Sequence, residues 1–168
     1  KSQLSSIKPF LISFFLLFNT KFLVRLIIVE FNTATFVIHV NSTVKNREWY
    51  RPLAPTVTEE DAKAFFEIEA TSPFMLFVNK VIPEKRKIIP AVTHVDGTAR
   101  VQTINKSQDP KFYELIKKFG IKTGIPILLN TSFNRRNDPI VESPENALEA
   151  FVAMDLDALI LEDFFYTT

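Results

Sequence analysis

The spacing of apolar and polar positions changes in a regular way along the chain from residue 41 onward. Short apolar runs, which predict strands, alternate with segments whose apolar residues recur every three or four positions, which predict helices. Strands are expected at residues 74–78, 87–92, 99–104, 125–129 and 157–161. Strands that alternate with helices in this way predict an α/β layer protein.

Three predicted helices begin with capping signals. A hydroxyl or carboxylate that can accept from free backbone N–H groups precedes each helix, and proline follows it in the last two cases. These caps are Thr58, Asp109 and Ser143. In the helix after Asp109, the expected apolar stripe is Tyr113, Ile116 and Phe119, and Gly120 is the expected C-terminal cap.

Residues 1–40 have a different character, with seven of the 17 phenylalanines, five charged residues and no glycine. A single transmembrane helix would bury Lys21 and Arg25 at a cost of about 2.5–3.5 kcal/mol each. The run at residues 10–18 follows two lysines, as in a signal peptide, but no small-x-small cleavage site comes after it. Three interpretations stay open: fragmentary or frameshifted sequence, strands at 22–30 and 35–40, or membrane targeting.

Composition excludes several classes of function. The chain is 46% hydrophobic and 23% charged, which is typical of a globular domain. A net charge of +1 gives no reason to expect nucleic acid or an anionic membrane as a partner. Without cysteine there is no disulfide, thiolate metal site or cysteine nucleophile, and two histidines do not suit a catalytic zinc site. Three glycines cannot form a glycine-rich phosphate loop.

Basic side chains gather at Lys45, Arg47 and Arg51. On an extended backbone Lys45 and Arg47 would share one face, where an anion would relieve their repulsion. A solvated basic edge with Glu48 as local partner is the alternative.

The segment from His94 to Gln102 offers a second candidate cluster. Arg100 and Gln102 would share a strand face, and Arg100 would suit an anion. His94 is a candidate general base, or else a residue that orients the turn at Asp96.

The third cluster is Thr131, Ser132 and Asn134, directly after a buried strand. Open α/β sheets bind ligands at such strand ends, and Ser132 and Asn134 would be co-facial. An Asx or Ser turn is the alternative. Four clustered phenylalanines are expected in the core rather than as a stacking platform: Phe65, Phe66, Phe164 and Phe165.

Four segments in this order resemble the carboxy-terminal domain of the nodulation-factor and antibiotic O-carbamoyltransferases. They are residues 45–55 (KNREWYRPLAP), 90–102 (PAVTHVDGTARVQ), 124–134 (GIPILLNTSFN) and 138–147 (DPIVESPENA). The resemblance covers residues 41–168 and leaves 1–40 outside the predicted domain. It implies an α/β, YrdC-like fold, a twisted mixed sheet with flanking helices.

The resemblance also implies the chemistry. Such a domain binds carbamoyl phosphate and ATP, with Mg²⁺ as counter-ion, and makes carbamoyl-adenylate. A separate amino-terminal actin-like ATPase-fold domain, which carries the metal, passes the carbamoyl group to a hydroxyl or amine. We therefore expect a cytoplasmic transferase with no metal site in this chain and with neither nucleic acid nor a membrane as partner.

Residue roles follow from the matching motifs. Arg100, Lys45 and Arg47 are the expected catalytic residues, and the expected substrate- and nucleotide-binding residues are Arg51, Ser132, Asn134, Thr131 and His94. The chain departs from the family where a loop with glycine and arginine precedes the Lys-x-Arg segment, and at Asn137–Asp138, where Gly-Glu is usual. Two alternatives remain: a non-catalytic remnant of the domain, or a threonylcarbamoyl-adenylate synthase-like nucleotide-binding protein.

Overall fold

The computed structural model describes residues 11–16, 23–28, 34–161 and 164–167. Seven strands form a mixed sheet in the order β10-β9-β1-β2-β8-β3-β7. Neighbours are antiparallel except for the pairs β1–β9 and β3–β7, which are parallel. The strands are β1 (Leu11–Leu16), β2 (Leu23–Ile28), β3 (Ala54–Thr58), β7 (Gln102–Ile104), β8 (Ile127–Ser132), β9 (Ala158–Leu161) and β10 (Phe164–Thr167).

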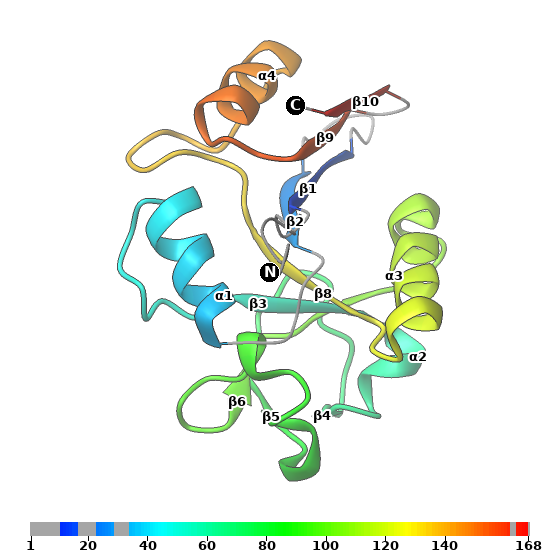
Figure 1. Cartoon of the computed structure of the whole chain (residues 1–168). Coiled ribbons are helices and arrows are strands. Elements are labelled where there is room, and N and C mark those ends of the chain that lie inside the picture. The colour runs from blue at the N-terminus through cyan, green and yellow to red at the C-terminus, as the bar shows by residue number, and fades with distance from the viewer. Residues whose placement is uncertain (1–10, 17–22, 29–33, 162–163, 168) are drawn as a thin grey trace, which may run out of the picture.

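A second, antiparallel sheet of three short strands has the order β4-β5-β6. Its members are β4 (Phe66–Glu67), β5 (Asn79–Val81) and β6 (Thr98–Ala99). The helices are α1 (Ala34–His39), α2 (Glu59–Ala62), α3 (Pro110–Thr123) and α4 (Pro144–Ala153), and the shorter turns are a π-helical turn, η1 (Val40–Val44), and two 3₁₀ turns, η2 (Pro83–Lys85) and η3 (Pro90–Val92). Figure 1 shows α4 beside β9 and β10 at one end of the molecule and the small sheet at the other.

The register of β3 and β8 positions the site. These two strands are antiparallel, and Ala54 at the start of β3 pairs with Asn130 near the end of β8. The chain that leads into β3 and the chain that leaves β8 therefore meet at one end of the sheet. Figure 1 shows α1 on one side of these strands and α3 on the other.

The three predicted caps are confirmed. The side chain of Thr58 accepts from Asp61 N at 3.3 Å, that of Asp109 from Phe112 N at 2.9 Å and that of Ser143 from Asn146 N at 3.2 Å. The helix that Thr58 begins is much shorter than the sequence pattern indicates, because it ends at Ala62 and Phe66 already lies in β4.

Helix α3 corrects two details of the prediction. Its buried stripe is Phe112, Ile116 and Phe119, with Tyr113 at the margin. The helix continues past Gly120, and Gly124 is the left-handed C-terminal cap, with φ 79°. Gly120 instead allows close packing, because a Cβ there would lie 2.7 Å from Cβ of Pro126.

Several strand predictions are wrong. Residues 74–78 have no regular structure and expose four large apolar side chains, whereas residues 87–92 end in η3. The strand predicted at 99–104 is split between β6 and β7, which belong to different sheets. Residues 35–40 lie in a helical segment, whereas the alternative of a strand at 22–30 agrees with β2.

The strands predicted at 125–129 and 157–161 are confirmed as β8 and β9, although β8 continues to Ser132. Phe65 and Phe66 lie in the core as expected. Phe164 and Phe165 do not, because they lie on the edge strand β10 with 66% and 63% of their surface exposed. Residues 1–10, which include the start of the proposed signal segment, lie outside the described residues. No helix in the part of the chain that the structure describes is long and apolar enough to cross a membrane.

Candidate functional site

Lys45 lies buried at the end of β8, with only 4% of its surface exposed. Its Nζ donates to the backbone oxygens of Ser132 and Asn134, at 2.7 and 2.6 Å, and to Oδ1 of Asn134 at 2.8 Å. All three ammonium hydrogens therefore have protein acceptors. Lys45 holds the end of β8 in place while it keeps a positive charge beneath the surface.

Ser132 and Asn134 lie together, as their spacing predicts. Ser132 Oγ donates to Asn134 Oδ1 at 2.6 Å, and Asn134 Nδ2 donates to the backbone oxygen of Asp138 at 2.9 Å. Thr131, the residue before them, is half-buried in β8 and does not line the same pocket. These bonds give the turn after β8 a defined shape, for which Asn137 takes a positive φ of 65°.

A pocket of about 290 Å³ lies over Lys45, between the two chain segments that the β3–β8 register brings together. Five of its nine lining residues are cationic and one is acidic. The lining residues are Lys45, Arg47, Glu48, Arg51, Ser132, Asn134, Arg135, Arg136 and Asn137. Lysine and arginine with hydroxyl and amide donors are groups that bind phosphate and carboxylate, so this pocket suits a polyanion.

The predicted geometry of the basic pair is wrong, although the pair does share the pocket. Lys45 and Arg47 do not lie on an extended strand, because Asn46 between them has φ 44°. Burial, and next the charge of Arg47, lower the pKa of Lys45 to about 8. Burial also lowers the pKa of Arg47, with Arg51 acting in the same direction and Glu48 against it.

The outer arginines are held by surface contacts. Nε of Arg51 lies 3.7 Å from Oε2 of Glu48, and Nη1 of Arg136 donates to the backbone oxygen of Asn46 at 3.0 Å. Arg135 forms an ion pair with Asp138. An anion that enters the pocket would therefore meet arginines that are partly ordered already.

His94 and Arg100 do not line this pocket. Nδ1 of His94 lies 3.0 Å from Oγ1 of Thr98, and Asp96 accepts from both the amide and the hydroxyl of Thr98. Burial lowers the pKa of His94; Arg100 acts in the same direction and Asp96 against it. His94 orients the turn, as the second interpretation of this histidine expected. Arg100 is exposed after β6.

The prediction that Gln102 and Arg100 share a strand face is wrong. Arg100 is exposed, whereas Gln102 is buried in a polar network that the sequence analysis missed. Its Oε1 accepts from Thr56 Oγ1 at 3.0 Å and from Asn130 Nδ2 at 2.7 Å, and its Nε2 donates to the oxygen of Pro73 at 2.8 Å. The signal that could have indicated it is a long amide side chain in each of two strands, Gln102 in β7 and Asn130 in β8, with a hydroxyl, Thr56, in β3 between them.

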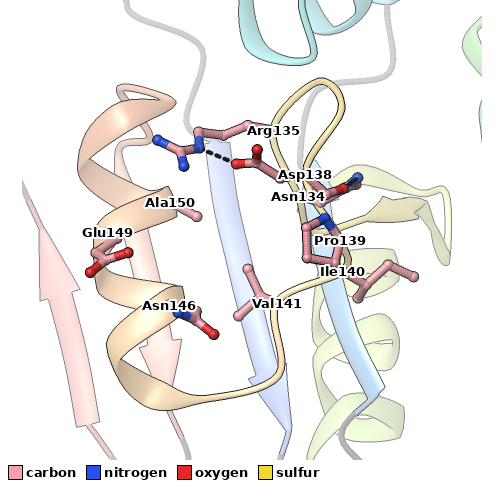
Figure 2. A pocket seen from close by; sticks show the side chains of 9 residues that line it. All are labelled: Asn134, Arg135, Asp138, Pro139, Ile140, Val141, Asn146, Glu149 and Ala150. Carbon is pink, nitrogen blue, oxygen red and sulfur yellow. Dashed lines mark hydrogen bonds and ion pairs between the residues drawn. The ribbon is translucent and has the colours of Figure 1, made fainter.

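A second pocket, of about 260 Å³, lies between α4 and the loop after β8. Figure 2 shows the Arg135–Asp138 ion pair above it, with Asn146 and Glu149 on the helix and Val141 on the loop. It shares Asn134 and Arg135 with the cationic pocket, so the two hollows adjoin. Among the described residues no group of three or more His, Cys, Asp or Glu gathers where it could hold a metal ion.

Comparisons with known proteins show which family this chain resembles. The family described as "Carbamoyltransferase C-terminus" matches residues 23–168. The chain is 46% identical over 143 residues to nodulation protein NolNO of Sinorhizobium fredii, which covers 83% of this chain and 21% of that protein. It is 32% identical over 123 residues to 3'-hydroxymethylcephem-O-carbamoyltransferase of Amycolatopsis lactamdurans, which covers 73% of this chain and 23% of that protein.

The fold class is confirmed by a solved structure. Full-length HypF, in a phosphate- and nucleotide-bound form, aligns with a TM-score of 0.57 at 19% identity, over 91% of this chain and 19% of that one. The fold is the expected α/β, YrdC-like one, a mixed sheet with flanking helices.

The family match begins within the segment that the sequence analysis left outside the domain, and it includes β2 and α1. The chain spans about a sixth to a quarter of the length of the curated relatives it matches. With 146 consecutive residues matched, from 23 to 168, the chain belongs to the carbamoyltransferase C-terminus family.

Proposed function

We propose that this domain binds ATP and carbamoyl phosphate in the cationic pocket and forms carbamoyl-adenylate there. The observation that carries the proposal is the convergence of Lys45, Arg47 and Arg51 with Ser132 and Asn134 around one pocket. One of the named relatives supports carbamoyl transfer in particular, since it is a 3'-hydroxymethylcephem-O-carbamoyltransferase.

The proposed step balances as follows. Water first hydrolyses carbamoyl phosphate to carbamate and phosphate. A carbamate oxygen then attacks the α-phosphorus of ATP, and the bond between the α-phosphorus and the leaving pyrophosphate breaks. Negative charge accumulates on the transferring phosphoryl oxygens and on the leaving pyrophosphate. Fixed positive charge and hydrogen-bond donors stabilise such a transition state without a covalent nucleophile.

The residues that line the pocket have different roles in this proposal. Arg47 and Arg51 would bind the polyphosphate. Asn134 would donate the second hydrogen of its Nδ2 to a phosphate oxygen, and Ser132 would donate once its hydroxyl turns away from Asn134 Oδ1. Buried Lys45 would add charge while it holds Ser132 and Asn134 in place. Mg²⁺ would arrive with the nucleotide, because Glu48 is the one carboxylate among the residues that line the pocket. Transfer to an acceptor hydroxyl or amine would fall to an actin-like ATPase-fold domain, which is proposed as a partner from the family resemblance. Roles for Arg100, His94 and Thr131 would require the ligand to extend beyond this pocket.

Pyrophosphate release from ATP by the 168-residue chain tests the proposal. We expect release that depends on carbamoyl phosphate and that Arg47→Ala reduces at least tenfold, with unchanged release in the charge-matched surface control Lys122→Ala. A threonine and bicarbonate mixture in place of carbamoyl phosphate tests the synthase-like alternative. If the folded chain neither binds ATP nor releases pyrophosphate with either mixture, the remnant interpretation is correct.

A further inference from the structure

Asn41 is a buried polar residue for which the proposed reaction has no role. It lies in η1, four residues before Lys45, with 0% of its surface exposed. Its Oδ1 accepts from Arg47 Nε at 2.8 Å, and its Nδ2 donates to the backbone oxygens of Trp49 and Arg51, at 3.1 and 2.8 Å. One side chain thus contacts three positions of the segment that carries the pocket's cations.

The bond to Nε fixes how Arg47 faces the pocket. A guanidinium has five N–H donors in a planar fork, so a bond to Nε sets the plane and leaves the two terminal nitrogens available. Among the described residues, Arg47 has no ion pair within 4.0 Å, unlike Arg51 and Arg135. A neutral amide therefore holds Arg47 and leaves its positive charge uncancelled. A carboxylate at position 41 would cancel that charge.

The two donor bonds hold the turn on which Arg51 stands. Packing does not hold this turn in the described structure, since Trp49 and Tyr50 are 61% and 67% exposed. Within the turn, Arg51 N donates to the oxygen of Glu48 at 3.2 Å. The Asn41 amide thus joins the turn to a buried part of the molecule.

We propose that Asn41 is a positioning residue that presents Arg47 and Arg51 to a phosphate-bearing ligand as a pre-oriented pair. This inference rests on the proposed function for its ligand, but its geometry does not depend on the reaction. Pre-orientation raises affinity because less side-chain freedom is lost when the ligand binds.

A double-mutant cycle tests the route through Arg47, with inorganic pyrophosphate as the probe and calorimetry as the measurement. We expect Asn41→Ala to weaken binding roughly tenfold and to have a much smaller effect when Arg47→Ala is already present. Ser42→Ala, which changes an exposed residue next to Asn41 in η1, is the matched control and should leave the affinity for pyrophosphate unchanged. An unchanged affinity in folded Asn41→Ala, or full additivity with Arg47→Ala, would overturn the proposal.

Two readings without ligand keep the inference separate from the proposed function. The Nε–H signal of Arg47 in ¹⁵N NMR should exchange slowly in the wild type and fast in Asn41→Ala. The anisotropy of Trp49, the single tryptophan, should fall as the turn loosens. If the wild type binds no pyrophosphate but both readings change as expected, the proposed function fails and the positioning role stands.

A second variant covers the case in which Asn41→Ala does not fold. Asn41→Asp keeps the side-chain volume and an acceptor for Arg47 but pairs with its charge and loses both donors. We expect a slow Nε–H signal with low Trp49 anisotropy and weakened pyrophosphate binding. Wild-type affinity in Asn41→Asp would contradict the argument that a neutral amide is required.

Discussion

At the scale of single residues, Lys45 carries the central electrostatic feature of the pocket. A buried ammonium is costly unless its hydrogens are bonded, and here all three are donated to oxygens of the last residue of β8 and of the turn after it. The neutral amine has only two hydrogens to donate, so deprotonation would loosen one of these bonds. The lowered pKa, about 8, brings this change close to physiological pH.

Anion affinity should therefore fall as the pH rises through about 8, because Lys45 loses the charge that attracts the anion. Sulfate is a suitable probe, since its own charge is constant over the range. Calorimetric titrations between about pH 6.5 and 9.5 should show the fall in the wild type, and Lys45→Met should bind weakly at every pH. A wild-type affinity that does not vary with pH would contradict the assignment to Lys45.

Stability should respond in the opposite direction. Because the folded pKa of Lys45 is about 8 and the ordinary value is 10.5, the unfolded chain binds more protons between these values. The contribution of Lys45 to the free energy of unfolding therefore rises with pH across that window and is least favourable below it. Denaturant melts at about pH 7 and 10 measure this effect. The free energy of unfolding of the wild type, relative to that of Lys45→Met, should be greater at pH 10 than at pH 7.

At the scale of secondary structure, the end of β8 is held from both faces. Polar contacts from Lys45 hold one side, and Phe133, which is fully buried between Ser132 and Asn134, anchors the other. The backbone oxygen of Phe133 also accepts from Val141 N at 3.0 Å. The two candidate ligand residues thus flank a core residue, so their positions depend on the packing of the core.

Phe133→Ala should reduce the free energy of unfolding by about 3–5 kcal/mol, since it leaves a cavity where a fully buried ring was. Phe164→Ala, at a residue 66% exposed, is the control and should stay within about 0.5 kcal/mol of the wild type. Urea unfolding followed by circular dichroism measures both. Equal losses in the two variants would show that burial does not describe their environments.

Helix α3 gives a second prediction at this scale. Asp109 accepts from Phe112 N at 2.9 Å at the helix start, so Asp109→Ala should cost about 1 kcal/mol. Asp109→Asn keeps an acceptor and should cost less, and Lys118→Ala, exposed on the same helix, should change little. If Asp109→Ala were as stable as Lys118→Ala, the cap would contribute nothing measurable.

At the scale of the whole molecule, the pocket joins segments nearly ninety residues apart. Lys45 contacts residues 87 and 89 positions away, and the antiparallel pairing of β3 with β8 brings them together. A ligand that bridges both segments should therefore stabilise the entire domain rather than one loop.

Pyrophosphate at about 100 times its Kd should raise the melting temperature by about 5–10 °C, which corresponds to roughly 2.7 kcal/mol. Arg47→Ala should remove most of this shift. Arg100→Ala should retain it, because Arg100 does not line the pocket. A shift lost in Arg100→Ala would extend the site to the turn after β6, and one retained in Arg47→Ala would place the anion elsewhere.

Local chemistry could be predicted from the sequence. The caps at Thr58, Asp109 and Ser143 are confirmed because a cap depends on residues three positions away. The pairing of Ser132 with Asn134 is also local, since the two residues are two positions apart. In contrast, periodicity does not encode which sheet a segment joins, or whether it joins one. For this reason it did not indicate that residues 99–104 divide between two sheets or that residues 74–78 form no strand.

The amino-acid sequence by itself determined the α/β class, the helix starts, the family and the residue types of the pocket. Only the tertiary structure decided what those residues contact. It buried Lys45 against the end of β8, set Asn41 behind Arg47, placed Gln102 in a polar network and left Arg100 outside the pocket. The physical reason is range: caps and periodicity act over a few residues, whereas each of these outcomes depends on contacts set by the packing of the folded chain.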